Sequence, residues 1–213
     1  MRLPIFPLHV VLFPGRPLPL HLFEARYRRM LDDCVNGDRR FGVVAIKAGL
    51  ETDKEPDTYD VGTVAEIEDV TELADGRFDI RVRGVDRFRI EQLYQGDPYP
   101  SASVACIPNG HAGDADHDNA QMLRKMLVPY LKLLGAPDEL LAHVPHEPDE
   151  LAYLAASAVQ ADLREQQALL ELETTTVRLQ ATLAALRRET GLIRHFGTVA
   201  SLRPPDPQGA ELN

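Results

Sequence analysis

The chain has 213 residues, of which 33 are acidic and 23 basic, so its formal net charge is -10. This length fits one large domain or two small ones. Acidic residues outnumber basic residues in both halves of the chain, which argues against nucleic acid and against an anionic membrane as partners. No stretch approaches the roughly 20 apolar residues that a membrane span needs. Without a signal peptide and with only two cysteines, the sequence is typical of a cytoplasmic protein with reduced thiols.

The composition changes near residue 108. Ten of the thirteen aromatic residues lie before it, together with the Val- and Ile-rich alternating runs that predict strands. Leucine and alanine at helical spacing follow it. We therefore predict an α+β chain with four parts. These are a strand-rich subdomain at residues 1–108, a polar linker at 109–117, a helical bundle at 118–190 and a partly disordered tail at 191–213.

The first nineteen residues contain five prolines. Prolines at this density exclude a helix and central strands, so we expect an extended edge segment with turns. Beyond Pro19, an apolar face with helical spacing predicts a helix over residues 23–35, which ends at Asn36 and Gly37. This face consists of Phe23, Tyr27, Met30, Leu31 and Cys34.

Five runs of alternating apolar residues after this helix predict strands. A turn at Asp75 and Gly76 and a second reversal at residues 84–86 indicate antiparallel pairing. Short antiparallel strands with one interposed helix predict a small, partly closed barrel or a folded sheet. The predicted strands are residues 41–46, 61–73, 77–83, 87–94 and 102–107, with an exposed loop at 47–60.

The second half of the chain reads as helical. Asp118 and Gln121 resemble a capping box that opens a helix, kinked at Pro129 and ended by Gly135. A long helix is predicted at residues 164–190, with a stripe of leucines spaced by three and four. The stripe fits packing within a bundle or pairing of two chains, so a monomer and a weak homodimer both stay open. The other predicted helices are residues 137–143 and 148–163, and the stripe is Leu169, Leu172, Leu179, Leu183 and Leu186.

The sequence lacks the signatures of common catalytic and cofactor sites. No glycine precedes a lysine as in a P-loop, and no G-x-G-x-x-G or G-x-S-x-G pattern follows a strand. Residues 114–119 copy the first oxygen positions of a calcium loop, but Asn119 and Lys125 stand where that loop needs glycine and glutamate. Cys34 and Cys106 are expected to be small core residues. We therefore expect no catalytic residues, no metal and no cofactor.

The N-terminal passage resembles the opening signature of the Lon protease N-terminal, substrate-binding domain family. The resemblance rests first on LPIFPL at residues 3–8, VLFPG at 11–15 and LPLHLFEARYR at 18–28. Because the further matches keep the family's order, the resemblance is specific and spans residues 1–190. These matches are FGVV at 41–44, VGTVAEI at 61–67, GR at 76–77, GVDRFRI at 84–90, PY at 98–99, QQALLE at 166–171 and RL at 178–179.

The resemblance implies a PUA-like folded β-barrel with one inserted helix, followed by an α-helical bundle that contains one long helix. In full-length Lon this region holds protein substrates, while an ATPase module unfolds them and a Ser-Lys dyad cleaves them. This chain has neither a P-loop nor a candidate dyad, so we expect a stand-alone, non-catalytic member that is not an enzyme. Its expected partners are unfolded or partly folded polypeptides, with a protease or chaperone as a further candidate. The expected role is that of an adaptor or holdase linked to ATP-dependent proteolysis.

Arg26 and Arg29 are the leading candidates for contact with a polypeptide, because they leave the apolar face of the first predicted helix beside the proline-rich edge. Together they could grip an extended chain by strand addition and charge contacts. Phe13, Phe23 and Glu24 complete the candidate site. Each also has a structural interpretation, since the two phenylalanines could fill the barrel end and Glu24 could pair with a residue four positions on.

Two functional hypotheses follow. Polypeptide binding requires an exposed apolar patch or groove of more than a few hundred Å², rimmed by polar groups. The alternative is a small-molecule sensor or enzyme that uses a cleft between the barrel and the helices, which requires a deep pocket with convergent polar groups.

Overall fold

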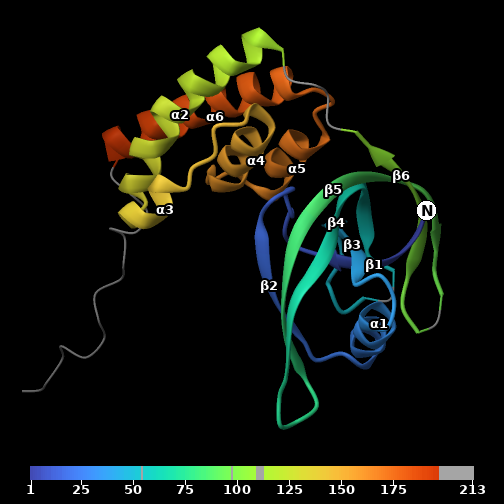
Figure 1. The fold of residues 1–213 in the computed structure, drawn as a ribbon. Coiled ribbons are helices and arrows are strands. Elements are labelled where there is room, and N and C mark those ends of the chain that lie inside the picture. The colour runs from blue at the N-terminus through green and yellow to red at the C-terminus, as the bar shows by residue number, and fades with distance from the viewer. Residues whose placement is uncertain (54, 97, 109–112, 197–213) are drawn as a thin grey trace, which may run out of the picture.

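The computed structural model describes residues 1–53, 55–96, 98–108 and 113–196 (Figure 1). Most of the predicted tail, and the first part of the predicted linker, lie outside the described residues. Within the described ranges six strands and one helix come first, and five helices follow, so the α+β prediction is confirmed. The strands are β1 (Arg2–Leu8), β2 (Pro17–Leu22), β3 (Arg40–Ala48), β4 (Asp57–Glu72), β5 (Phe78–Tyr94) and β6 (Ser101–Ile107), with α1 (Ala25–Val35) between β2 and β3.

The strands form one sheet in the order β2-β5-β4-β3-β1-β6. Strand β6 also pairs with β5, so β5, β4, β3, β1 and β6 form a closed ring. Strand β1 runs parallel to β3, whereas the other pairs are antiparallel. Strand β2 pairs with the first part of β5 alone and therefore lies at the edge of the sheet.

The prediction that prolines keep the N-terminal segment at an edge is wrong for β1. This strand lies between β3 and β6, with Ile5 opposite Gly42 and Leu3 opposite Ala102. Each proline removes one backbone donor, but the neighbouring residues still pair. Leu3 and Ile5 are each 1% exposed, so burial of their side chains favours the central position. Strand β2, which contains Pro17 among its residues, is at the edge as predicted.

The two predicted reversals have different outcomes. Gly76 has a φ of 75° in the turn between β4 and β5, where the Leu73 amide donates to the Arg77 carbonyl, so the predicted hairpin is confirmed. The predicted reversal at residues 84–86 is wrong, because β5 continues through it. A Cβ at Gly84 would lie 2.3 Å from the carbonyl oxygen of Phe13. The glycine therefore permits a close crossing of two chain segments rather than a turn.

Five helices follow the sheet. The first begins at Asp114 rather than at the predicted Asp118, because the carboxylate of Asp116 accepts from the Gly113 amide at 2.9 Å and so caps the helix earlier. None of the helices among the described residues is long and apolar enough to cross a membrane. The helices are α2 (Asp114–Leu133), α3 (Asp138–Ala142), α4 (Pro148–Ala158), α5 (Leu163–Glu171) and α6 (Thr175–Phe196).

The prediction of one helix over residues 164–190 is wrong, because the structure has two helices there, α5 and α6, separated by a short non-helical segment. The Thr174 hydroxyl accepts from the Val177 amide at 3.3 Å and caps the N-terminus of α6. The Arg87 guanidinium donates a hydrogen bond to the Leu172 carbonyl at 2.6 Å. In an uninterrupted helix this carbonyl would accept from a backbone amide of the same helix. Most of the leucine stripe is buried within this chain, with Leu169, Leu179, Leu183 and Leu186 exposed by 7% or less.

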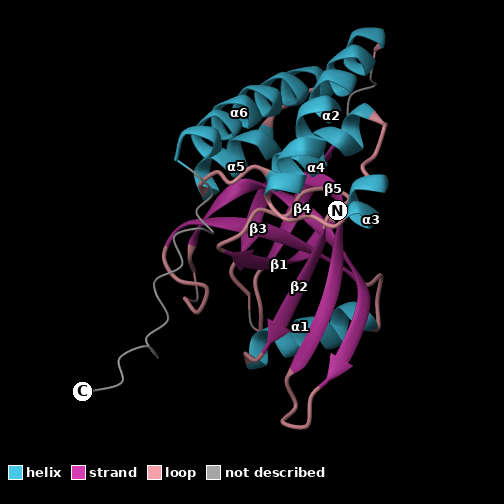
Figure 2. Ribbon diagram, turned by 90° about the vertical axis from the view of Figure 1, so that its left-hand side faces the viewer, coloured by secondary structure: helices cyan, strands magenta, loops and turns pink. Residues whose placement is uncertain are grey.

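The helices α2–α6 lie on one side of the strand-rich part, and α1 lies on the opposite side (Figures 1 and 2). A buried cluster joins sheet and helices, with Phe13 and Val61 packed near Tyr153 and Leu169. Arg87 of β5 is 1% exposed and donates to the carbonyls at the α5–α6 break. The two layers are therefore joined by apolar packing and by buried hydrogen bonds.

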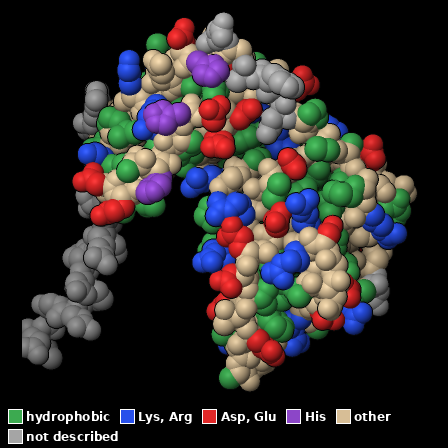
Figure 3. All heavy atoms as spheres, viewed as in Figure 1, with side chains coloured by type: hydrophobic (Ala, Val, Ile, Leu, Met, Phe, Trp, Pro, Cys, Tyr) green, Lys and Arg blue, Asp and Glu red, His purple; other side chains and the backbone are tan. Residues whose placement is uncertain are grey.

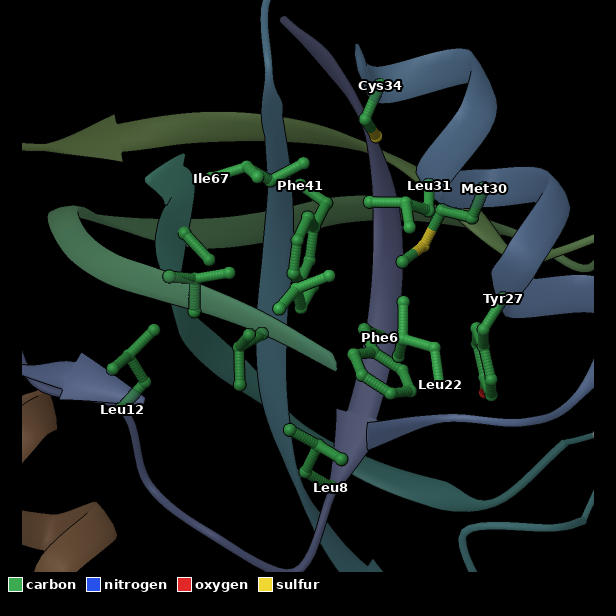
Figure 4. Close-up of a cluster of buried hydrophobic side chains, with 14 residues drawn as sticks. Phe6, Leu8, Leu12, Leu22, Tyr27, Met30, Leu31, Cys34, Phe41 and Ile67 are labelled. Atoms are coloured by element: carbon green, nitrogen blue, oxygen red, sulfur yellow. The ribbon is translucent and has the colours of Figure 1, made fainter. Parts of the chain in front are cut away.

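Helix α1 packs on one face of the sheet. Side chains of β1 alternate, so that Phe6 and Leu8 belong to the cluster that includes the buried face of α1 (Figure 4), while Ile5 joins a second cluster with Phe88. Cys34 is buried in the α1 core as expected, but Cys106 is exposed. Cys106 lies near the end of β6, beyond the part of the strand that the core covers.

Candidate functional site

A groove of about 320 Å³ lies between β2 and the start of α1. We call it the β2–α1 groove. Its rim is polar, with His21, Glu24, Glu51 and Thr52. The apolar lining comes from β1, the segment after it, β2 and the start of α1. These residues are Phe6, Leu8, Val10, Leu18, Pro19, Leu20, Leu22, Phe23 and Tyr27.

The alternation of β2 builds the apolar wall. Leu18, Leu20 and Leu22 are less exposed than Pro17, Pro19 and His21 between them. Figure 4 shows Leu22 of β2 in one cluster with Phe6 and Leu8 of β1 and Tyr27 of α1. The groove therefore combines an apolar lining with a polar rim, which are two of the properties that the polypeptide-binding hypothesis requires.

The two candidate phenylalanines lie in different places. Phe23 borders the groove, its side chain is 55% exposed and its ring stacks on that of His21 at a centroid distance of 6.3 Å. The interpretation of Phe23 as filler of the barrel end is wrong, because α1 begins at Ala25 and leaves Phe23 off the buried face. Phe13 is 1% exposed and lies 6.5 Å from the Tyr153 ring at the junction of sheet and helices. It does not line the groove.

Arg26 holds a loop against α1. Its Nη1 and Nη2 donate to the carbonyls of Asp53 at 2.9 Å and Glu51 at 2.8 Å, and its Nε donates to Glu24 at 2.9 Å. These acceptors engage all three guanidinium nitrogens. Arg26 therefore positions the loop at residues 49–53, which forms part of the groove rim.

The position at which α1 begins determines the partners of the remaining charged candidates. Glu24 pairs with Arg26 rather than with Arg28, because Glu24 precedes the helix and lacks the geometry of a pair four residues apart. Arg28 donates instead to the Gly76 carbonyl at 3.1 Å. Arg29 is 60% exposed, pairs with Asp33 at 3.1 Å and does not line the groove. Among the predicted site residues, the structure thus brings together Phe23, Glu24 and, behind the rim, Arg26.

Tyr27 is a groove residue, whereas helical spacing alone predicts only that it belongs to the core. It is 2% exposed, and its hydroxyl has no hydrogen-bond partner among the described residues. Burial raises the pKa of this phenol to about 12, the neighbouring Arg26 opposes that shift, and Glu24 and Glu51 add to it. The available signal was tyrosine, rather than phenylalanine, on the buried face of a helix.

The outer edge of β2 is poorly suited to strand addition. An added strand needs backbone donors along the open edge, and Pro17 and Pro19 have none. Side-chain docking into the β2–α1 groove does not need those donors. This disfavours the strand-addition part of the sequence-based hypothesis.

Three further cavities bear on the small-molecule alternative. They measure about 380, 250 and 10 Å³, and the residues that line them all lie before residue 107. None of these cavities, nor the β2–α1 groove, combines sheet and α2–α6 residues. Figure 3 shows the helices overhanging the strand-rich part above an open recess.

The chain matches the family model described as ATP-dependent protease La (LON) substrate-binding domain over residues 2–188. It is 30% identical to Lon protease 2 of Myxococcus xanthus over 200 residues, which cover 90% of this chain and 24% of that protein. It is also 30% identical to Lon protease 2 of Syntrophobacter fumaroxidans over 184 residues, 84% of this chain and 23% of the relative. The chain therefore spans about a quarter of the curated relatives it matches.

Two solved structures resemble this fold. A Lon N-terminal domain protein from Xanthomonas campestris superimposes with a TM-score of 0.64 at 27% identity, covering 86% of this chain and 98% of that one. The N-terminal domain of a Mycobacterium avium complex Lon protease gives a TM-score of 0.71 at 21% identity, covering 88% of this chain and 98% of that one. At that identity the second likeness concerns the fold alone.

Proposed function

We propose that this chain, which belongs to the family of ATP-dependent protease La (LON) substrate-binding domains, binds polypeptides. The bound parts are apolar segments of unfolded or partly folded chains, and they bind in the β2–α1 groove. The observation that supports this site is the combination of an apolar lining, a polar rim and the 55% exposed ring of Phe23. Apolar side chains that leave water for such a lining gain about 25 cal/mol per Å² of buried area.

Binding through side chains follows from the edge of β2. Because its prolines remove backbone donors, a bound segment is held by apolar side chains that enter the groove. The net charge of -10 offers no positive field that would attract a polypeptide over a distance. Affinity therefore depends on the apolar content of the segment and little on its net charge.

We extend the proposal to the architecture and the cellular role. The closed strand ring is the PUA-like barrel of residues 1–108, joined through the linker at 109–117 to a helical bundle at 118–190. The chain acts without catalysis of its own, as an adaptor or holdase in ATP-dependent proteolysis in the cytoplasm. The family match and the fold likeness support this role.

A comparison of two exposed apolar side chains tests the site. Phe23→Ala removes the exposed ring at the groove, whereas Leu140→Ala changes a 64% exposed side chain on α3. We expect Phe23→Ala to weaken binding of labelled, reduced and carboxymethylated α-lactalbumin by about five- to tenfold, and Leu140→Ala to leave it unchanged. Equal affinity of Phe23→Ala and the parent chain would remove the groove from the proposal.

A further inference from the structure

The hydroxyl of Tyr27 is a polar group without a partner in an apolar wall. The Tyr27 ring packs against Phe6 at a centroid distance of 4.3 Å, between α1 and β1. Its hydroxyl has no hydrogen-bond partner within the described part of the chain, and it is shielded from solvent. The ring also lines the β2–α1 groove. A buried donor of this kind is unfavourable in a folded protein unless a ligand satisfies it.

A second tyrosine beside α1 shows the ordinary arrangement. Tyr99 packs at the edge of the same core, and its hydroxyl donates to Asp33 at 2.8 Å. Phenylalanine would fill the position of Tyr27 with the same ring and without the unpaired hydroxyl. The hydroxyl of Tyr27 therefore makes no hydrogen bond within the described residues, although Tyr27 is one of the residues that line the groove.

The surroundings define the acceptor that this hydroxyl would take. A phenol with the ordinary pKa of 10.0 is already protonated at neutral pH, and burial raises the pKa of Tyr27 further, to about 12. The hydroxyl is thus a donor. The groove lining contains the carboxylates of Glu24 and Glu51 and, among its described residues, no lysine or arginine. The Arg26 guanidinium pairs with Glu24 and lies 4.5 Å from the centre of the Tyr27 ring, so Glu24, Glu51 and Arg26 together carry one net negative charge. An anionic acceptor would meet that charge, whereas a neutral carbonyl would not.

We propose that Tyr27 donates a hydrogen bond to a backbone carbonyl within the apolar segment that occupies the groove. This inference rests on the proposed function and adds the atom that recognises the main chain. The segment reaches the hydroxyl when the side chains that line the groove around Tyr27 rearrange. An internal carbonyl of an apolar stretch is preferred over a terminal carboxylate, and the groove thereby selects unfolded segments with accessible main chain.

Two probes separate the hydrogen bond from apolar binding. One is a labelled peptide of alternating leucine and serine with both termini blocked, and the other is diphenylhexatriene, which has no hydrogen-bonding group. We expect Tyr27→Phe to weaken binding of the peptide about fivefold, the factor in affinity that corresponds to one net hydrogen bond. It should bind diphenylhexatriene as the parent chain does, with a Tm no lower than that of the parent. Tyr99→Phe, the matched control, should leave both affinities unchanged.

The outcomes distinguish this inference from the proposed function. If Tyr27→Phe and the parent chain bind the peptide with equal affinity, the inference is overturned and the proposed function is not. A lowered Tm of Tyr27→Phe, with weaker binding of both the peptide and diphenylhexatriene, would indicate a structural role and would also overturn the inference alone. If the parent chain binds neither probe, the groove is not a binding site and the proposed function fails with it.

Discussion

The guanidinium carbon of Arg26 lies 4.5 Å from the centre of the Tyr27 ring. Arg26 also donates to the carbonyls of Glu51 and Asp53, so a single side chain links the groove wall to the loop at its rim. Cation–π contact and hydrogen bonds to backbone carbonyls both favour arginine over lysine at this position.

Removing Arg26 should loosen the 49–53 loop. We expect Arg26→Ala to lower the free energy of unfolding by about 1–2 kcal/mol, because two carbonyls and the Glu24 carboxylate lose their donor. Hydrogen exchange should become faster at the amide of Asp53, which donates to the Leu50 carbonyl within the loop.

Arg29 on the same helix provides the control. Its ion pair with Asp33 joins side chains that are 60% and 36% exposed, so Arg29→Ala should change stability by less than about 0.5 kcal/mol. Protection of the loop in Arg26→Ala equal to that of the parent chain would show that Arg26 does not hold it.

The sequence predicted the local features of the fold that depend on neighbouring residues. Gly76 marks a hairpin because a positive φ is a local demand, and the buried face of α1 follows from helical spacing. The central position of β1 could not be predicted in this way, since it depends on pairing with β3 and β6, which are distant in the sequence. Thr174 caps the N-terminus of α6, and threonine is a common N-cap residue. The absence of glycine and proline around it nevertheless favours the prediction of one uninterrupted helix.

The same distinction applies to the groove. Phe23 and Glu24 are adjacent in one short sequence signature, so the sequence alone predicts that they lie in the same site. The role of Arg26 depends on a loop 25 to 27 residues away, so the sequence suggested an external partner for a charge that the chain itself satisfies. The unpaired state of the Tyr27 hydroxyl is likewise visible only in three dimensions.

Arg87 should be the most sensitive position at the junction of sheet and helices. It is 1% exposed and donates to the carbonyls of Leu170 at 2.8 Å and Leu172 at 2.6 Å. Arg87→Met removes the side-chain donor to the Leu170 carbonyl, whereas the Leu172 carbonyl still accepts from Arg178, so we expect a loss of about 1–3 kcal/mol in urea unfolding. Arg87→Lys should recover little, because an ammonium lacks the planar fork of donors.

The control for Arg87 lies two residues further along β5. Arg89 is exposed, and Arg89→Met should stay within about 0.5 kcal/mol of the parent chain. Similar losses in both variants would mean that the junction does not depend on the buried hydrogen bonds of Arg87.

Alkaline pH should destabilise the fold through Cys34. Burial, with smaller effects of Asp38 and Asp33, raises the pKa of this thiol from 9.0 to about 12. Between these values the unfolded chain has lost the proton and the folded chain keeps it, so the free energy of unfolding falls as the pH rises above about 9. Below pH 9 this contribution is fully present.

Urea unfolding between pH 8 and pH 10.5, a window of about 2.5 units chosen around the ordinary thiol pKa, measures that slope. Cys34→Ala should show a shallower decline with pH than the parent chain, even though the smaller side chain lowers its stability at every pH. Cys106→Ala, at an exposed position, should decline like the parent. A slope in Cys34→Ala as steep as that of the parent would assign the pH dependence to other groups.

The central claim is that apolar polypeptide segments bind in the β2–α1 groove. Site-specific photo-crosslinking tests it most directly, with benzoylphenylalanine in place of Phe23 at the groove or of Leu140 on α3, two side chains that are 55% and 64% exposed. On illumination with a labelled unfolded protein, we predict covalent adducts from position 23 that excess unlabelled unfolded protein suppresses, and no specific adducts from position 140. Adducts from position 140 alone, or equal and unsuppressed adducts from both, would contradict the account.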